Sequence, residues 1–108
     1  MLDTALLSSI ATQLMNAPEV DVDGHKLSIA RTSLHRFKTV TFTMNGREYM
    51  AIEQNASKPS YWGSLARKGH QVVQFKDVKT DRFVAVAVDG DVKEYGGMHH
   101  RKDPRNDL

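Results

Sequence analysis

Residues 58–77 read KPSYWGSLARKGHQVVQFKD, and this stretch decides how the elements around it are arranged. Serine and proline at its start favour the first turn of a helix, because serine can accept a backbone N–H and proline lacks one. Gly69 suits the position that ends a helix, and Arg67 and Lys68 suit the negative end of its dipole. The β-branched and aromatic run VVQF that follows is typical of a strand. We therefore predict a short helix that leads directly into a β-strand.

Two hairpins are expected before this stretch. Asn45-Gly46 separates two alternating runs, and both residues tolerate the positive φ of a type I′ turn. Asp23-Gly24 gives the same signal within residues 19–30. The register that Asn45-Gly46 imposes puts one apolar set on one face of the sheet: Val40, Phe42, Met44, Tyr49 and Ala51. The opposite face is mixed: Thr39, Thr41, Thr43, Glu48, Met50 and Ile52.

An amphipathic helix is expected over residues 2–15. An apolar residue recurs at every fourth position from Leu6 to Leu14, which is the spacing of one helix face. Asp3 or Thr4 can cap its first turn, because either side chain can accept an unpaired backbone N–H. Such a stripe predicts a helix that packs on the domain or on a second copy of it.

Three strands are expected after the short helix, at residues 71–78, 82–88 and 91–95. The middle run, RFVAVAV, is apolar on both faces, which is typical of a strand with neighbours on both sides. Asp89-Gly90 supplies a tight turn into the last strand. Strands joined by such turns run antiparallel.

The expected fold class is α+β. We predict an N-terminal amphipathic helix packed on a strongly twisted antiparallel sheet or small barrel-like wrap, with a short helix between hairpins. Residues 1–97 are expected to form a single domain. Residues 98–108 have almost no apolar content and are expected to form a mobile C-terminal tail.

Composition narrows the function classes. The chain has no cysteine, which excludes thiol chemistry, disulfides and thiolate metal sites. It has no apolar run long enough for a transmembrane helix and no signal-peptide pattern, so we expect no membrane association and a cytoplasmic location. No metal site and no cofactor motif is found, because the internal histidines lack ligand spacing and no phosphate-binding glycine loop occurs.

The positive charge is concentrated in the middle of the chain. Residues 31–76 carry eight basic and two acidic side chains, whereas the segments before and after them are net acidic. Seven residues are candidates for a basic surface that binds nucleic acid or an acidic protein: Arg36, Lys38, Lys58, Arg67, Lys68, His70 and Lys76. Tyr61 and Trp62 lie beside them, and such rings can stack on single-stranded bases. The alternative for Trp62 is an anchor that holds the short helix on the sheet.

Catalysis has little support in the sequence. His70 and Glu53 are the titratable pair to examine first, because both flank the stretch at residues 58–77. The expected function is a small non-catalytic interaction module that binds nucleic acid or another polyanion through the basic face. Two alternatives stay open, a homo-oligomeric adaptor and a small ligand-binding or hydrolytic protein.

Overall fold

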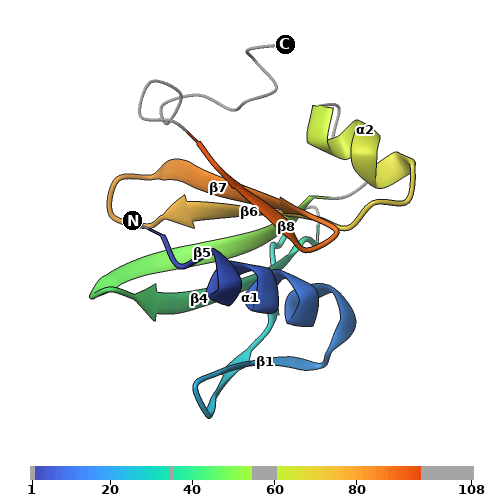
Figure 1. Ribbon diagram of the computed structural model, residues 1–108. Coiled ribbons are helices and arrows are strands. Elements are labelled where there is room, and N and C mark those ends of the chain that lie inside the picture. Colours follow the sequence, from blue (N-terminus) through green and yellow to red (C-terminus); the bar gives the residue numbers. More distant parts are fainter. Residues whose placement is uncertain (1, 35, 55–60, 96–108) are drawn as a thin grey trace.

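A computed structural model describes residues 2–34, 36–54 and 61–95 of the chain. Its elements are α1 (Thr4–Asn16), β1 (Glu19–Val22), β2 (His25–Ser28), β3 (Ala30–Arg31), β4 (Lys38–Met44), β5 (Arg47–Gln54), α2 (Tyr61–Arg67), β6 (Val72–Asp77), β7 (Arg82–Val88) and β8 (Asp91–Glu94). The strands β3 to β8 form a six-stranded sheet in chain order, and β1 and β2 form a separate hairpin (Figure 1). Each strand is antiparallel to its neighbours, which confirms the predicted α+β class with an antiparallel sheet.

The sheet is open, so the barrel-like wrap is wrong. β3 and β8 are its two edges and do not pair with each other. β3 is two residues long, and three of the four residues of β8 are charged. Short and charged edges discourage pairing with a further strand. No separate strand was predicted at β3, because two residues are too few to show a strand pattern.

The predicted turns are confirmed. Asn45 and Gly46 both have positive φ, 54° and 74°, and they join Met44 to Arg47 in the predicted register. Asp23-Gly24 and Asp89-Gly90 have the same conformation. Positive φ at both positions gives the twist that suits a two-residue hairpin.

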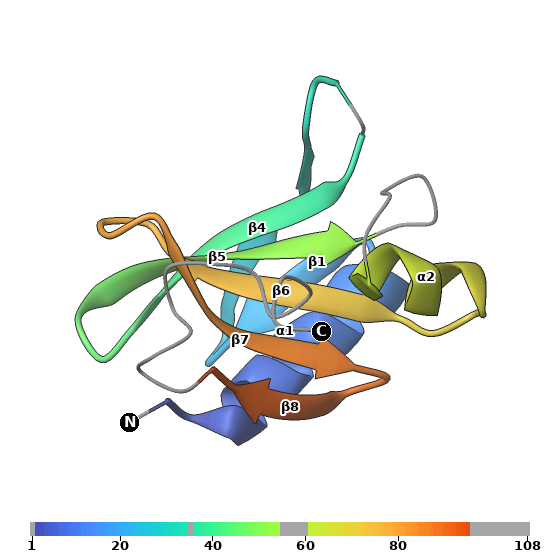
Figure 2. The ribbon, with the colours of Figure 1, turned by 90° about the horizontal axis from the view of Figure 1, so that it is seen from above.

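The helix α1 covers one face of the sheet (Figure 2). Asp3 caps it, and its carboxylate accepts the Leu6 N–H at 3.1 Å. The buried stripe runs through Leu7, Ile10 and Leu14; Ile10 and Leu14 belong to the predicted stripe, whereas Leu6 is only half-buried. Because this stripe lies inside the core, α1 offers little apolar surface to a second copy of the chain. Neither helix of the described residues has the length and apolar content needed to span a membrane.

The core on the α1 face contains the residues that the hairpin register predicted. They are Val40, Phe42, Met44, Tyr49 and Ala51, joined by residues of α1, β1, β6 and β7. Phe42 packs against Tyr49 and Phe75, with ring centroids 5.9 and 6.2 Å apart. The predicted tail at residues 98–108 lies outside the described residues, and the extent of the domain stays a prediction.

The helix α2 lies on the opposite face of the sheet (Figure 2). Here the buried cluster is small and consists of Trp62, Val72 and Val86, with Leu65 packed against it. Trp62 is 8% exposed, so the interpretation of this ring as the anchor of the short helix is confirmed. The two faces of the sheet therefore differ greatly in the depth of their packing.

Candidate functional site

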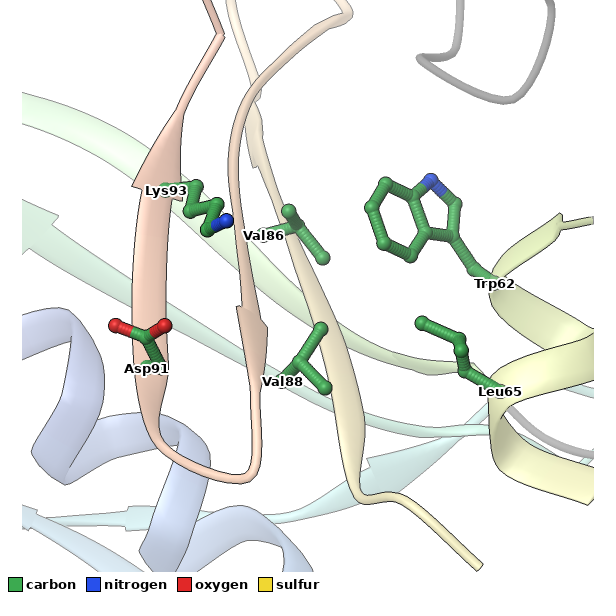
Figure 3. A pocket seen from close by; sticks show the side chains of 6 residues that line it. All are labelled: Trp62, Leu65, Val86, Val88, Asp91 and Lys93. Atoms are coloured by element: carbon green, nitrogen blue, oxygen red, sulfur yellow. The ribbon is translucent and has the colours of Figure 1, made fainter. Parts of the chain in front are cut away.

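The strongest candidate site lies between α2 and the β7–β8 hairpin. Gly69, at φ 95°, ends α2, and the His70 N–H returns to the Leu65 carbonyl at 3.1 Å. This tight ending turns the chain into β6 and sets the apolar side of α2 over β7. Trp62 and Leu65 thus face the outer side of the β7 strand across a gap (Figure 3).

This gap is a cavity of about 280 Å³, which we call the α2 groove. Its lining residues are Trp62, Leu65, Val86, Val88, Asp91 and Lys93. The first four make apolar walls and a floor, and Val86 at the floor is 2% exposed. Small-molecule sites begin at roughly 300 Å³, so the α2 groove suits an occupant about the size of one amino acid.

Two opposite charges stand at the rim of the α2 groove. Asp91 and Lys93 are two residues apart on β8, so their side chains project to the same face of the sheet. Figure 3 shows the ammonium end of Lys93 directed across β7 toward Val86. Within the part of the chain that the structure describes, neither Asp91 nor Lys93 forms an ion pair.

Two buried amides lie under α2 on the same face of the sheet. Gln74 donates from Nε2 to the Tyr95 hydroxyl at 2.9 Å. Gln54 is 2% exposed and pairs with Val72 across the strands, yet neither polar atom of its side chain has a hydrogen-bond partner among the described residues. An amide without a partner is costly to bury. The layer under α2 is therefore polar as well as thin, a feature that the sequence pattern did not reveal.

Two other cavities are explained by the packing and the hydrogen bonds of the residues around them. One, of about 250 Å³, lies between the β1–β2 hairpin and β4, where Val22 and Leu27 approach Phe42. The other, of about 340 Å³, lies around Arg47 and Asp77. There the Asp77 carboxylate accepts from the Arg47 guanidinium at 2.6 and 3.0 Å. These partners fix the turn that follows β6.

Asp77 shows how strongly that turn is held. Burial raises the pKa of its carboxyl. The Arg47 hydrogen bond, the backbone N–H groups of Thr80 and Lys79, and the Arg47 charge together outweigh burial and hold the pKa below its usual value. Arg47 pairs with a carboxylate that is 8% exposed, while its own side chain is 50% exposed. The Asp77 carboxylate therefore caps the turn that follows β6.

The residues predicted for a basic surface lie in several places. Arg67, Lys68 and His70 lie together at the end of α2 and in the connection to β6. Lys76, near the end of β6, forms an ion pair with Asp81 at 2.9 Å. Lys58 lies outside the described residues. The convergence of all seven on one surface stays a prediction.

Lys38 and Arg36 lie in a different part of the fold, at the start of β4 and in the connection before it. The ammonium of Lys38 donates to the Met15 carbonyl at the end of α1, at 3.4 Å. Lys38 thus lies on the α1 face, whereas Arg67 belongs to the helix on the opposite face. Arg36 is exposed in the connection between β3 and β4, at φ 60°.

His70 and Glu53, the titratable pair, contact different partners. The His70 Nδ1 lies 2.7 Å from a carboxylate oxygen of Asp89 in the β7–β8 turn. Glu53 instead accepts the backbone N–H of Lys38 at 2.8 Å. Asp89 also accepts the Gln71 N–H at 2.8 Å, and these two hydrogen bonds lower the pKa of the Asp89 carboxyl. Both side chains thus have structural contacts, and a catalytic role for them stays a prediction.

The described residues contain no group of three or more histidine, aspartate or glutamate side chains placed to hold a metal ion. No family model, curated protein or solved structure matches the chain.

Proposed function

We propose that this protein is a small non-catalytic binding module and that the α2 groove is its binding site. The observation that supports this is the apolar cavity of about 280 Å³ between α2 and the β7–β8 hairpin, with charges at its rim. Binding sites of small proteins combine apolar walls with a few polar groups that orient the ligand. The α2 groove has both.

The thin packing under α2 also supports a binding role. Trp62 is the principal buried side chain of α2, and it forms one wall of the α2 groove. A ligand that enters the groove adds apolar contacts to a layer that has few of its own. Each such contact stabilises the bound state by roughly 25 cal/mol for each Å² of apolar surface removed from water.

The proposal is tested by titration with small aromatic and branched aliphatic molecules. Trp62 is the only tryptophan of the chain, so its fluorescence reports directly on the α2 groove. A ligand of this size is expected to bind with Kd of roughly 0.1–1 mM. Backbone amide shifts in an NMR titration should change at α2, β7 and β8 and stay constant at β1 and β2.

A pair of variants distinguishes the α2 groove from non-specific apolar binding. Val88→Phe places a ring in the groove and is expected to abolish the titration. Val78→Phe adds the same ring at an exposed position between β6 and β7 and is expected to leave the titration unchanged. Equal loss in both variants, or undetectable binding in the wild-type protein, would contradict the proposal.

A second candidate function is the binding of nucleic acid or another polyanion. It is favoured by Arg67 and Lys68, which are exposed side by side at the end of α2. Lys76 adds less to this positive surface, because its ammonium pairs with Asp81, and His70 contacts the Asp89 carboxylate. Trp62 is buried and does not supply a stacking surface.

The polyanion candidate is tested by salt titration with a mixed-sequence single-stranded oligonucleotide. Each phosphate contact is expected to contribute about −0.7 to the slope of log K against log salt. The double variant Arg67→Gln/Lys68→Gln should flatten that slope, whereas Lys26→Gln on the β1–β2 hairpin should not. Undetectable binding at low salt would rule this function out.

A further inference from the structure

We infer that the α2 groove binds a free amino acid with an apolar side chain, with Asp91 receiving its ammonium group and Lys93 its carboxylate. The inference rests on the proposed function and adds the chemical class of the ligand. It depends on two features of the groove, its unpaired rim charges and its apolar interior.

The rim charges are arranged as a complement to a zwitterion. Residues two apart on a strand have Cα atoms about 6.7 Å apart. This spacing leaves room between the Asp91 carboxylate and the Lys93 ammonium, which do not pair with each other. An amino acid carries its ammonium and carboxylate on one carbon, so both charges can lie in that space with opposite partners. Hydrogen bonds between charged groups are about twice as strong as neutral ones.

Several basic side chains of the described residues already have a carboxylate partner, whereas Lys93 and Asp91 form no ion pair there and line one groove together. Lys26, Arg47, His70 and Lys76 each lie within 4 Å of a carboxylate of the protein. Both Asp91 and Lys93 line the groove from β8, and Figure 3 shows the Lys93 ammonium extending toward β7 while the Asp91 carboxylate lies over β8. An anionic ligand would meet repulsion from Asp91, and a cationic ligand would meet repulsion from Lys93. A ligand that carries both charges is favoured at both ends.

The interior of the groove selects the side chain. Trp62 and Leu65 form one wall, and Val86 and Val88 form the floor. A side chain the size of leucine or phenylalanine fills much of the cavity of about 280 Å³. Glycine has the same two charges and no apolar body, so it should bind far more weakly. Each buried CH₂ group contributes roughly 0.8 kcal/mol.

The experiment compares phenylalanine and leucine with analogues that lack one charge. Calorimetry and amide shifts are measured for L-phenylalanine, L-leucine, phenethylamine, 3-phenylpropanoate and glycine. The zwitterions with apolar side chains are expected to bind at least about tenfold more tightly than phenethylamine or 3-phenylpropanoate, a difference of roughly 1.4 kcal/mol. Glycine is expected to give no detectable heat.

Variants assign each charge to its partner. Asp91→Asn should weaken L-phenylalanine while leaving 3-phenylpropanoate no weaker, because that analogue has no ammonium group. Lys93→Gln should weaken L-phenylalanine while leaving phenethylamine no weaker. Glu94→Gln is the matched control, since this exposed carboxylate of β8 alternates to the other face of the sheet. Thermal unfolding confirms that the variants are folded.

The outcomes separate this inference from the proposed function. If phenethylamine and 3-phenylpropanoate bind as well as L-phenylalanine and Val88→Phe blocks all three, the α2 groove is a binding site and the amino-acid inference is wrong. If no probe binds at about 10 mM, a limit of roughly −2.7 kcal/mol, both are wrong. A preference for the zwitterion that Asp91→Asn and Lys93→Gln both remove, and Glu94→Gln keeps, supports both.

Discussion

The two faces of the sheet are packed to very different depths. On the α1 face, fourteen of the described residues form a continuous buried core that draws on α1, β1 and β4 to β7. On the α2 face, three buried residues hold a helix of seven. The stability of the fold therefore resides mainly on the α1 face. The α2 face carries the cavity, whose rim charges form no ion pair with other described residues, and its looser packing suits a surface that receives a ligand.

The polar groups of the two faces differ in the same way. Asp77, at the margin of the α1 face, has Arg47 and two backbone N–H groups as partners. Gln54, on the α2 face, is as deeply buried, and its side chain has no hydrogen-bond partner in the described part of the chain. Stable interiors satisfy nearly all their buried polar groups. At Gln54 the α2 face departs from this rule, and proteins commonly tolerate such a local cost on functional surfaces.

The largest effect is expected from Phe75→Ala on the α1 face. Phe75 is fully buried between β5 and β7, so its removal leaves a cavity and should lower the free energy of unfolding by about 3–5 kcal/mol. Val86→Ala is the comparison on the α2 face, where the open groove lets neighbours relax, and it should cost about 1–2 kcal/mol. Urea denaturation measures both. An equal or larger loss for Val86→Ala would reverse the comparison of the two faces.

Trp62→Ala should act locally. It removes the anchor of α2 and should lower global stability by about 2 kcal/mol, less than Phe75→Ala, because α2 can separate while the α1 core persists. Amide hydrogen exchange should accelerate in α2 and change little in β4 and β5. Uniform acceleration through the whole sheet would show that the α2 face is part of one cooperative core.

Gln54→Leu should stabilise the protein. Leucine has a similar size and no unpaired polar atoms, so the substitution should raise the free energy of unfolding by about 1–2 kcal/mol. Gln74→Leu is the matched control. It removes the hydrogen bond to Tyr95 from the same face and should stabilise less or destabilise. If Gln54→Leu destabilises, the Gln54 amide has a partner in solution and the contrast with Asp77 disappears.

Asp77→Asn should have the smallest effect at neutral pH. Asparagine keeps an oxygen for the Lys79 and Thr80 N–H groups and loses the ion pair, which is worth below about 1 kcal/mol because Arg47 is half exposed.

The pH dependence of this variant has a definite sign. Because the pKa of Asp77 is lower in the folded protein than in the unfolded chain, the contribution of its carboxylate is fully present above the unfolded value of about 4. It is lost as the pH falls through the folded value. Thermal midpoints between neutral and acidic pH should therefore fall less steeply for Asp77→Asn than for the wild-type protein. Parallel curves would show that Arg47 does not hold this carboxyl.

The sequence predicted the parts of the fold that depend on local chemistry. Asn45-Gly46 and Asp89-Gly90 fix two hairpins through their backbone conformations, and the alternation around Phe42 fixes which side chains face the core. β3 escaped detection because its pairing depends on the preceding and following loops more than on its own two residues.

The candidate site was much harder to predict. The α2 groove forms because Trp62 packs on Val86 and because β8 carries Lys93 beside it, so it combines α2 with a hairpin that lies beyond β6 in the chain. Alternation shows that Asp91 and Lys93 share a face, and it does not show that α2 leaves a space next to them. A sequence shows directly where basic residues cluster, as they do in the middle of this chain. It does not show where side chains leave a cavity.

The hydrogen bond from the Ser8 hydroxyl to the Gly90 carbonyl, 2.6 Å long, joins residues 82 positions apart. On a ribosome that adds about 5–20 residues per second, Gly90 is made roughly 4–16 s after Ser8. During that interval, the apolar stripe of α1 is already synthesised while the β7 and β8 strands that it covers are not. The nascent chain is therefore expected to present this helix to chaperones until the last hairpin closes, and a stalled chain that ends before β8 should be a preferred target for degradation.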